Sequence, residues 1–191
     1  MLTGKHTQHQ QFKEVFEQYY STLCQFAYSF VKERGSSEDI VQEVFLRVWE
    51  KRPDLIGTDG LRYYLFTSVR NNCLSFLQQE KKSMIVPIDG LAVPTDLQEP
   101  GWEAEPAIDH LSLIQKGLSM LPPKCKEVFL LSRLGDLSYK QIASTLDISV
   151  KTVENQMGKA LKLLRGFMKE NRVFGIMWII AGIHYIYMTV S

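Results

Sequence analysis

The sequence predicts an all-α protein: two small helical domains, an acidic proline-rich linker between them, and an apolar C-terminal tail helix. Three observations predict this fold. Apolar residues recur at three- and four-residue spacing through most of the chain, strand-like alternation between hairpin turns is absent, and four prolines interrupt the helical pattern within 83–107. With 45% hydrophobic and 23% charged residues, the 191-residue chain has the composition of a folded protein.

The N-terminal domain, 12–82, is predicted to contain three helices. The first carries an apolar stripe from Phe12 to Phe30. The second is expected to start at Ser36-Ser37-Glu38-Asp39, where a capping hydroxyl precedes two acids, and to end before Pro53. After a loop through Gly57–Gly60, the third helix is predicted from about Leu61 to Gln79.

The linker, 83–107, separates regions of different charge. Residues 83–110 carry no Lys or Arg and a net charge of −6, whereas 111–172 carry +6. The prolines exclude a long helix in the linker, and its acids favour a flexible, solvated segment. The basic C-terminal part is suited to neutralising phosphates.

The C-terminal domain, 108–170, contains a predicted helix-turn-helix at 137–165. Ser138 and Gln141 form a capping box, and Asp147 occupies a turn position that favours a left-handed backbone. Ser149 is expected to cap the second helix. A plain helix hairpin with a solvated basic face is the alternative. The coincidence of caps, turn, small Ala143 and basic second helix favours DNA binding.

The start of that second helix is predicted to direct polar and basic side chains outward, as recognition helices do in the major groove. Asn155 suits adenine, Glu154 can accept from cytosine N4, and Lys151 can hold a phosphate or guanine. The candidate DNA contacts are Lys151, Thr152, Glu154, Asn155, Gly158, Lys159 and Arg165.

The sequence predicts neither an enzyme nor a cofactor or metal site. It shows no nucleophile–base pair, glycine-rich phosphate loop or metal-ligand cluster, and its four histidines are expected in the tails or the linker. The three cysteines lie about fifty residues apart without a C-x-x-C pair, which is typical of reduced cytoplasmic thiols. The polar N-terminus does not resemble a signal peptide, so a cytoplasmic location is expected.

Residues 12–168 resemble the extracytoplasmic-function sigma factors, the smallest class of RNA polymerase specificity subunits. Three stretches carry the likeness: Ser37–Trp49, Leu61–Asn71, and Leu121–Leu131 followed by the helix-turn-helix. The resemblance implies that the chain binds core RNA polymerase and promoter DNA, with an anti-sigma factor as a further partner. The helix-turn-helix would then contact the −35 element.

The resemblance also implies two residue sets in the N-terminal domain. Polymerase would be bound by Asp39, Gln42, Glu43, Leu46 and Arg47. The −10 element would be opened and captured by Arg62, Tyr63, Tyr64, Arg70, Asn71 and Asn72. Tyr64 stands where the family usually has Trp, so core residue and base contact both stay open for it. A solvated helix face is the alternative for the polymerase set.

Two segments and one rival function are left open. The linker either occupies a nucleic-acid path on the polymerase or serves as a solubilising tether. The tail 173–190 has no charged residue, which fits either membrane contact or packing on protein. The rival function is a helix-turn-helix regulator that binds an operator without polymerase, and it would not need the Asp39–Trp49 helix.

Overall fold

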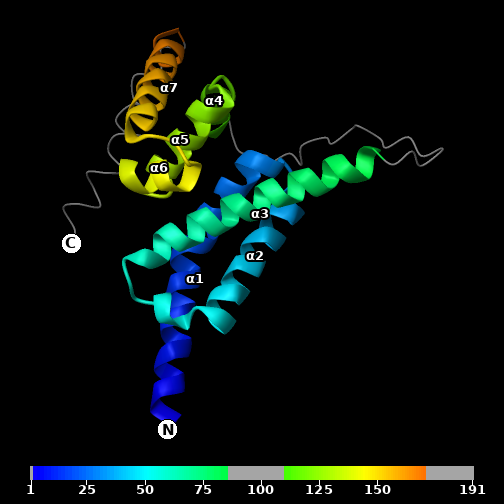
Figure 1. Ribbon diagram of the computed structural model, residues 1–191, viewed down its shortest axis with the longest axis vertical. Helices are drawn as coiled ribbons and strands as arrows, with labels where there is room; N and C mark the ends of the chain where they lie inside the picture. Colours follow the sequence, from blue (N-terminus) through cyan, green and yellow to red (C-terminus); the bar gives the residue numbers. More distant parts are fainter. Residues whose placement is uncertain (1, 86–109, 171–191) are drawn as a thin grey trace. The chain divides into compact units, whose positions relative to one another are not determined.

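The fold is all-α, as predicted. The computed structural model describes residues 2–85 and 110–170, in which there are seven α-helices, one 3-10 helix and no strand (Figure 1). The helices are α1 (Leu2–Val31), α2 (Arg34–Lys51), η1 (Pro53–Leu55), α3 (Gly60–Ile85), α4 (His110–Ser119), α5 (Pro123–Arg133), α6 (Tyr139–Leu146) and α7 (Val150–Glu170). The predictions for the tail 173–190, and for the linker beyond residue 85, lie outside these ranges.

The helices group into two compact units. The first combines α1–α3 with Leu130–Leu146, and the second combines α4 and the start of α5, up to Phe129, with α7. The division passes through the predicted C-terminal domain, so the domain boundaries remain a prediction.

The core of the first unit is formed where α1, α2 and α3 pack against one another (Figure 1). Phe26 of α1 and Phe66 of α3 meet edge-on, with ring centroids 5.2 Å apart, and both are fully buried. The other fully buried side chains of these helices are Leu23, Ala27, Val41, Val44, Val48, Leu65, Val69 and Cys73. Burial raises the pKa of the Cys73 thiol to about 12, so this cysteine stays protonated and unreactive.

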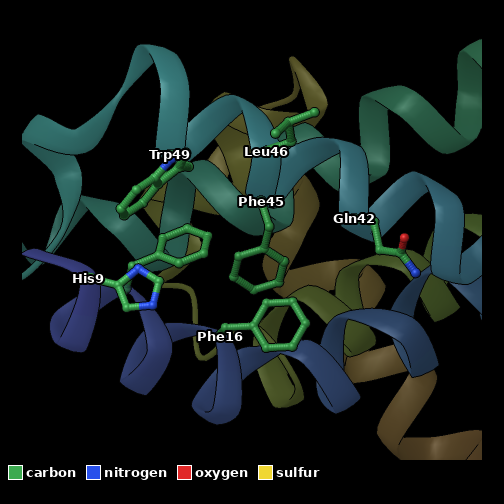
Figure 2. A pocket seen from close by; sticks show the side chains of 7 residues that line it. His9, Phe16, Gln42, Phe45, Leu46 and Trp49 are labelled. Atoms are coloured by element: carbon green, nitrogen blue, oxygen red, sulfur yellow. The ribbon is translucent and has the colours of Figure 1, made fainter.

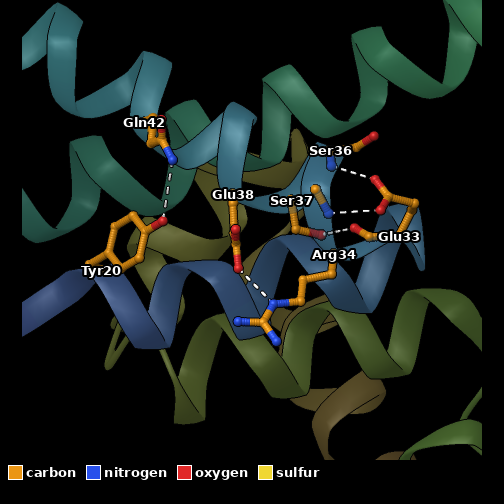
Figure 3. Close-up of polar contacts among 8 residues, drawn as sticks. Tyr20, Glu33, Arg34, Ser36, Ser37, Glu38 and Gln42 are labelled. Carbon is orange, nitrogen blue, oxygen red and sulfur yellow. Dashed lines mark hydrogen bonds and ion pairs between the residues drawn. The ribbon is translucent and has the colours of Figure 1, made fainter. Parts of the chain in front are cut away.

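Two helix starts differ from the prediction. α1 begins at Leu2, ten residues before the apolar stripe, so His9 is helical and does not belong to a tail. α2 begins at Arg34 and not at the serines, because the Glu33 carboxylate accepts the backbone N–H groups of Gly35 and Ser36 (Figure 3). A carboxylate satisfies these free donors and also suits the positive end of the helix.

Ser37, predicted in the cap, is instead 2% exposed and donates its hydroxyl to the Glu33 carbonyl (Figure 3). The third helix is also longer than predicted, since α3 continues past Gln79 to Ile85. The first residues assigned to the linker, 83–85, therefore belong to a helix.

The turn chemistry around α6 and α7 confirms the prediction. Gln141 Oε1 accepts the backbone N–H of Ser138 at 2.9 Å, and Ser138 Oγ accepts the N–H of Gln141 at 3.3 Å, which completes the capping box. Asp147 adopts a φ of 51° between the helices. Ser149 Oγ accepts the N–H of Thr152 at 3.1 Å and so caps α7.

In the second unit α4 and α5 both contact α7. A Cβ added at Gly117 would lie 3.3 Å from the Phe167 ring, so any larger residue here would have to displace that ring by a few tenths of an ångström. Cys125 of α5 donates its thiol to the Gln156 side chain at 2.9 Å. Among the residues that the structure describes, no helix is long and apolar enough to span a membrane.

Candidate nucleic-acid and polymerase interfaces

The predicted DNA contacts on α7 face away from its buried side. Val153, Met157, Ala160 and Leu164 form the buried stripe. Six of the predicted contacts lie outside this stripe and are exposed: Lys151, Glu154, Asn155, Gly158, Lys159 and Arg165. Thr152 is partly covered, and its hydroxyl pairs with Ser149 at 2.8 Å, so its first role is to complete the cap.

One contact on this face was not predicted. Lys151 Nζ donates to Glu154 Oε2 at 3.1 Å, one helical turn along α7. Lys151, whose ammonium group is predicted to contact a phosphate or guanine, therefore also positions the carboxylate of Glu154, which is predicted to contact cytosine. Asn155 lies beside this pair with its side chain exposed.

α2 separates its buried and exposed residues in the same way. Val41, Val44 and Phe45 are buried, whereas Asp39, Gln42, Glu43 and Leu46 are exposed on the other side. Arg47 pairs with Glu43 at 2.8 Å. Gln42 donates to the Tyr20 hydroxyl at 3.5 Å, which ties this face to α1 (Figure 3). The face predicted to bind polymerase is thus exposed, and two of its side chains are paired with neighbouring residues.

An apolar groove adjoins this face and was not predicted as part of it. It has a volume of about 390 Å³, and α1 and α2 line it with His9, Phe12, Phe16, Gln42, Phe45, Leu46 and Trp49 (Figure 2). The Phe12 and Trp49 rings lie 4.9 Å apart, and His9 meets Trp49 edge-on at 5.8 Å. Leu46 is 54% exposed, which is high for a leucine beside an apolar groove.

The predicted −10 residues on α3 do not form one uniform surface. Arg62 donates to the Asp136 carboxylate at 2.6 Å, and its guanidinium lies 5.6 Å from the Tyr19 ring centroid. The Tyr63 hydroxyl lies 3.5 Å from Ser144 Oγ, and this hydrogen bond, with help from Thr145, lowers the pKa of the phenol.

The remaining −10 candidates lie elsewhere on α3. Arg52 stacks on the Tyr64 ring at 5.3 Å, so Tyr64 supports the loop between α2 and α3. Arg70 donates to the exposed Asn71 side chain at 3.3 Å. The amide nitrogen of Asn72 is buried, without a hydrogen-bond partner in the described part of the chain. Of these residues, Asn71 presents the most accessible polar group.

These features define an all-α protein with a helix-turn-helix, a motif typical of DNA-binding proteins, and a second exposed helix face on α2. Family models match residues 15–83 to sigma-70 region 2 and residues 111–164 to sigma-70 region 4. The chain belongs to the sigma-70 family, in its extracytoplasmic-function class. Members of this family are regulatory, non-enzymatic proteins.

Similar proteins and solved structures support the assignment to this family. The sigma factor SigL of Mycobacterium tuberculosis is 27% identical over 161 residues, covering 83% of this chain and 89% of SigL. SigZ of Bacillus subtilis is 25% identical and covers 81% and 87%. The sigma factor RpoE, solved with the anti-sigma factor NepR from Bartonella quintana, shares the fold with a TM-score of 0.62 at 23% identity, covering 83% of this chain and 96% of RpoE.

The chain is therefore a polymerase-binding factor for promoter-specific initiation of transcription, and the operator-binding alternative is not favoured.

Proposed function

We propose that three helix faces of the protein each carry one function in transcription initiation. α7 contacts the −35 element through Glu154 and Asn155, α3 contacts the −10 element, and the exposed face of α2 docks on core polymerase. The observation that carries the proposal is the separation of buried and exposed residues on α7, which leaves both base-contacting candidates accessible beside a basic surface. Asn and Glu side chains at the start of a recognition helix suit base edges in the major groove.

The test combines purified protein, core RNA polymerase and a library of promoter DNA. Initiation at a defined subset of promoters, only when both proteins are present, is the expected result. Tight binding to duplex DNA without polymerase, together with no initiation, would instead indicate an operator-binding regulator. The groove beside Leu46 favours the first outcome, because an operator-binding protein has no use for it.

Three further points belong to the proposal. The protein acts in the cytoplasm, where core polymerase is found, and it catalyses no reaction itself. The sigma factor RpoE was solved in complex with the anti-sigma factor NepR, and the similar chain CnrH was solved in complex with the cytosolic domain of CnrY. A protein of that kind is the expected regulatory partner here, and the apolar groove between α1 and α2 is a surface that it can cover.

Gly158 offers a test that separates stability from DNA binding. A Cβ at Gly158 would meet nothing within 4 Å, and the residue lies inside α7. Gly158→Ala is therefore expected to stabilise the fold by about 0.5–1 kcal/mol, because alanine loses less backbone entropy in a helix. Binding to −35 DNA in the holoenzyme should nevertheless weaken, since the new methyl group stands where the DNA approaches.

Gly166→Ala is the matched control. Gly166 lies on the same helix and also has nothing within 4 Å of an added Cβ. Thermal unfolding should show similar stabilisation of both variants, whereas promoter binding should fall only for Gly158→Ala. Unchanged promoter binding by both would remove Gly158 from the proposed DNA surface.

A further inference from the structure

Gln156 of α7 is a polar residue at the margin of the exposed face of this helix, and it was not among the predicted DNA contacts. It lies between the exposed Asn155 and the buried Met157, and its own exposure is intermediate. Thr152, which completes the cap of α7, stands one turn earlier on the same margin. Gln156 therefore belongs to the first two turns of the helix, the part that recognition helices direct to DNA.

A buried thiol holds one end of the Gln156 carboxamide. Cys125 of α5 is fully buried and donates to Gln156 Oε1 at 2.9 Å, and both residues belong to the second unit. The Nε2 amino group has no partner in the described part of the chain, and it is not among the buried unpaired atoms found there, so solvent reaches it. The carboxamide thus turns its oxygen toward α5 and its nitrogen outward.

This orientation decides what Gln156 can bind. A carboxamide accepts through its oxygen and donates through its nitrogen, so with the oxygen held inside only the donor end is left. Phosphate oxygens of DNA accept hydrogen bonds, and glutamine is one of the side chains that donate to them. Because Gln156 lies at the margin of the exposed face and not at its centre, it is placed for the phosphates along the groove wall.

We propose that Gln156 is a further DNA contact, which donates through Nε2 to a backbone phosphate of the −35 element. Cys125 is the positioning residue that keeps the amide oxygen turned away from that phosphate. The pair fixes the depth and register of α7 in the groove, which is what phosphate contacts supply, and it leaves base readout to Glu154 and Asn155. The inference rests on the proposed contact between α7 and the −35 element.

Gln156→Ala removes one neutral hydrogen bond to DNA. Holoenzyme binding to promoters that differ singly at each −35 position should weaken about two- to tenfold for all of them alike. The dependence of affinity on salt should stay that of the wild type, because no charge is lost. Lys159→Ala is the matched control on the same helix. Lys159 is exposed and cationic, so its loss should weaken binding to all promoters and also reduce the salt dependence.

Variants of Cys125 test the positioning role. Cys125→Ala lets the carboxamide rotate, so affinity should fall by no more than in Gln156→Ala, and adding Cys125→Ala to Gln156→Ala should cause no further loss. Cys125→Ser keeps a donor at the same place and should restore most of the affinity. Cys73→Ala controls for the loss of a buried thiol, since Cys73 is also fully buried but lies in the first unit. It should lower the unfolding midpoint without changing DNA affinity.

Gln156→Glu tests the sign of the contact. The Cys125 thiol can still donate to one carboxylate oxygen, but the other would then face the phosphate, so this variant should bind more weakly than Gln156→Ala. Wild-type affinity of Gln156→Ala, a loss confined to one base pair, or additive losses in the double variant would each overturn the inference, while promoter-specific initiation by the wild type would still support the proposed function. Absence of promoter-specific initiation by the wild-type holoenzyme would overturn the proposed function itself.

Discussion

Asn155→Ala is expected to relax the preference for one base pair of the −35 element. A bidentate amide–adenine contact contributes about 1–3 kcal/mol of discrimination, which corresponds to about 5- to 150-fold between the preferred base and the others. The exposed position of Asn155 means that the fold should be unaffected, because the side chain leaves no cavity when it is shortened. The measurement is holoenzyme binding to promoters that differ singly at each −35 position.

Glu154→Ala should relax the preference at a different base pair of the −35 element, and we expect it to have a second effect. Its carboxylate holds Lys151 Nζ at 3.1 Å, so the variant loses a base contact and also releases an ammonium group. Nonspecific affinity is therefore expected to rise slightly while discrimination at one base pair falls. Lys151→Ala should likewise disturb specificity, because it removes the partner that positions Glu154.

Arg165→Ala serves as the control for both variants. Arg165 is exposed six residues beyond Lys159, where we expect a cation to contact backbone phosphate and not a base edge. It should weaken binding to all promoters to a similar degree and reduce the salt dependence. If Glu154→Ala and Asn155→Ala left every base preference unchanged, the assignment of readout to these two residues would be wrong.

Local chemistry explains which parts of the fold could be predicted. The capping box at Ser138, the left-handed Asp147 and the Ser149 cap all depend on interactions within a few residues, and all three are present. The start of α2 was predicted wrongly because two kinds of cap competed within four residues. The Glu33 carboxylate reaches two backbone N–H groups, and Ser37 is drawn into the buried side of the helix.

The candidate sites also include features that could not be predicted from local chemistry. The exposed faces of α2 and α7 follow from helical periodicity, so their residues could be named from the sequence. The apolar groove could not, because it forms only when His9 and Phe12 of α1 meet Trp49 of α2. The pairing of Arg62 with Asp136 joins residues 74 positions apart, and no local pattern indicates such a contact. The sequence also shows a stripe of aromatic residues on α1, but such a stripe predicts a buried core as readily as a groove.

Leu46→Asp is expected to weaken binding to core polymerase at least tenfold. Leu46 projects from the exposed face of α2 at the edge of the groove, as Figure 2 shows, and Gln42 lies on the same face. Burying an exposed leucine side chain contributes about 1.5–3 kcal/mol, which corresponds to about 10- to 150-fold in affinity. Aspartate would also place an unpaired charge in the interface, which adds a desolvation cost.

Met120→Asp is the control for a general effect of removing exposed apolar surface. Met120 is 53% exposed, nearly the same as Leu46 at 54%, but it follows α4 in the second unit. Both variants should keep the wild-type helical content and unfolding midpoint, because neither side chain is part of the core. Binding to labelled core polymerase should then fall for Leu46→Asp and stay within about twofold of wild type for Met120→Asp.

An equal loss in the two variants would mean that surface hydrophobicity, and not the α2 face, determines docking. An unchanged Leu46→Asp would move the polymerase contact away from the groove, toward the charged Asp39 and Glu43 end of the same face.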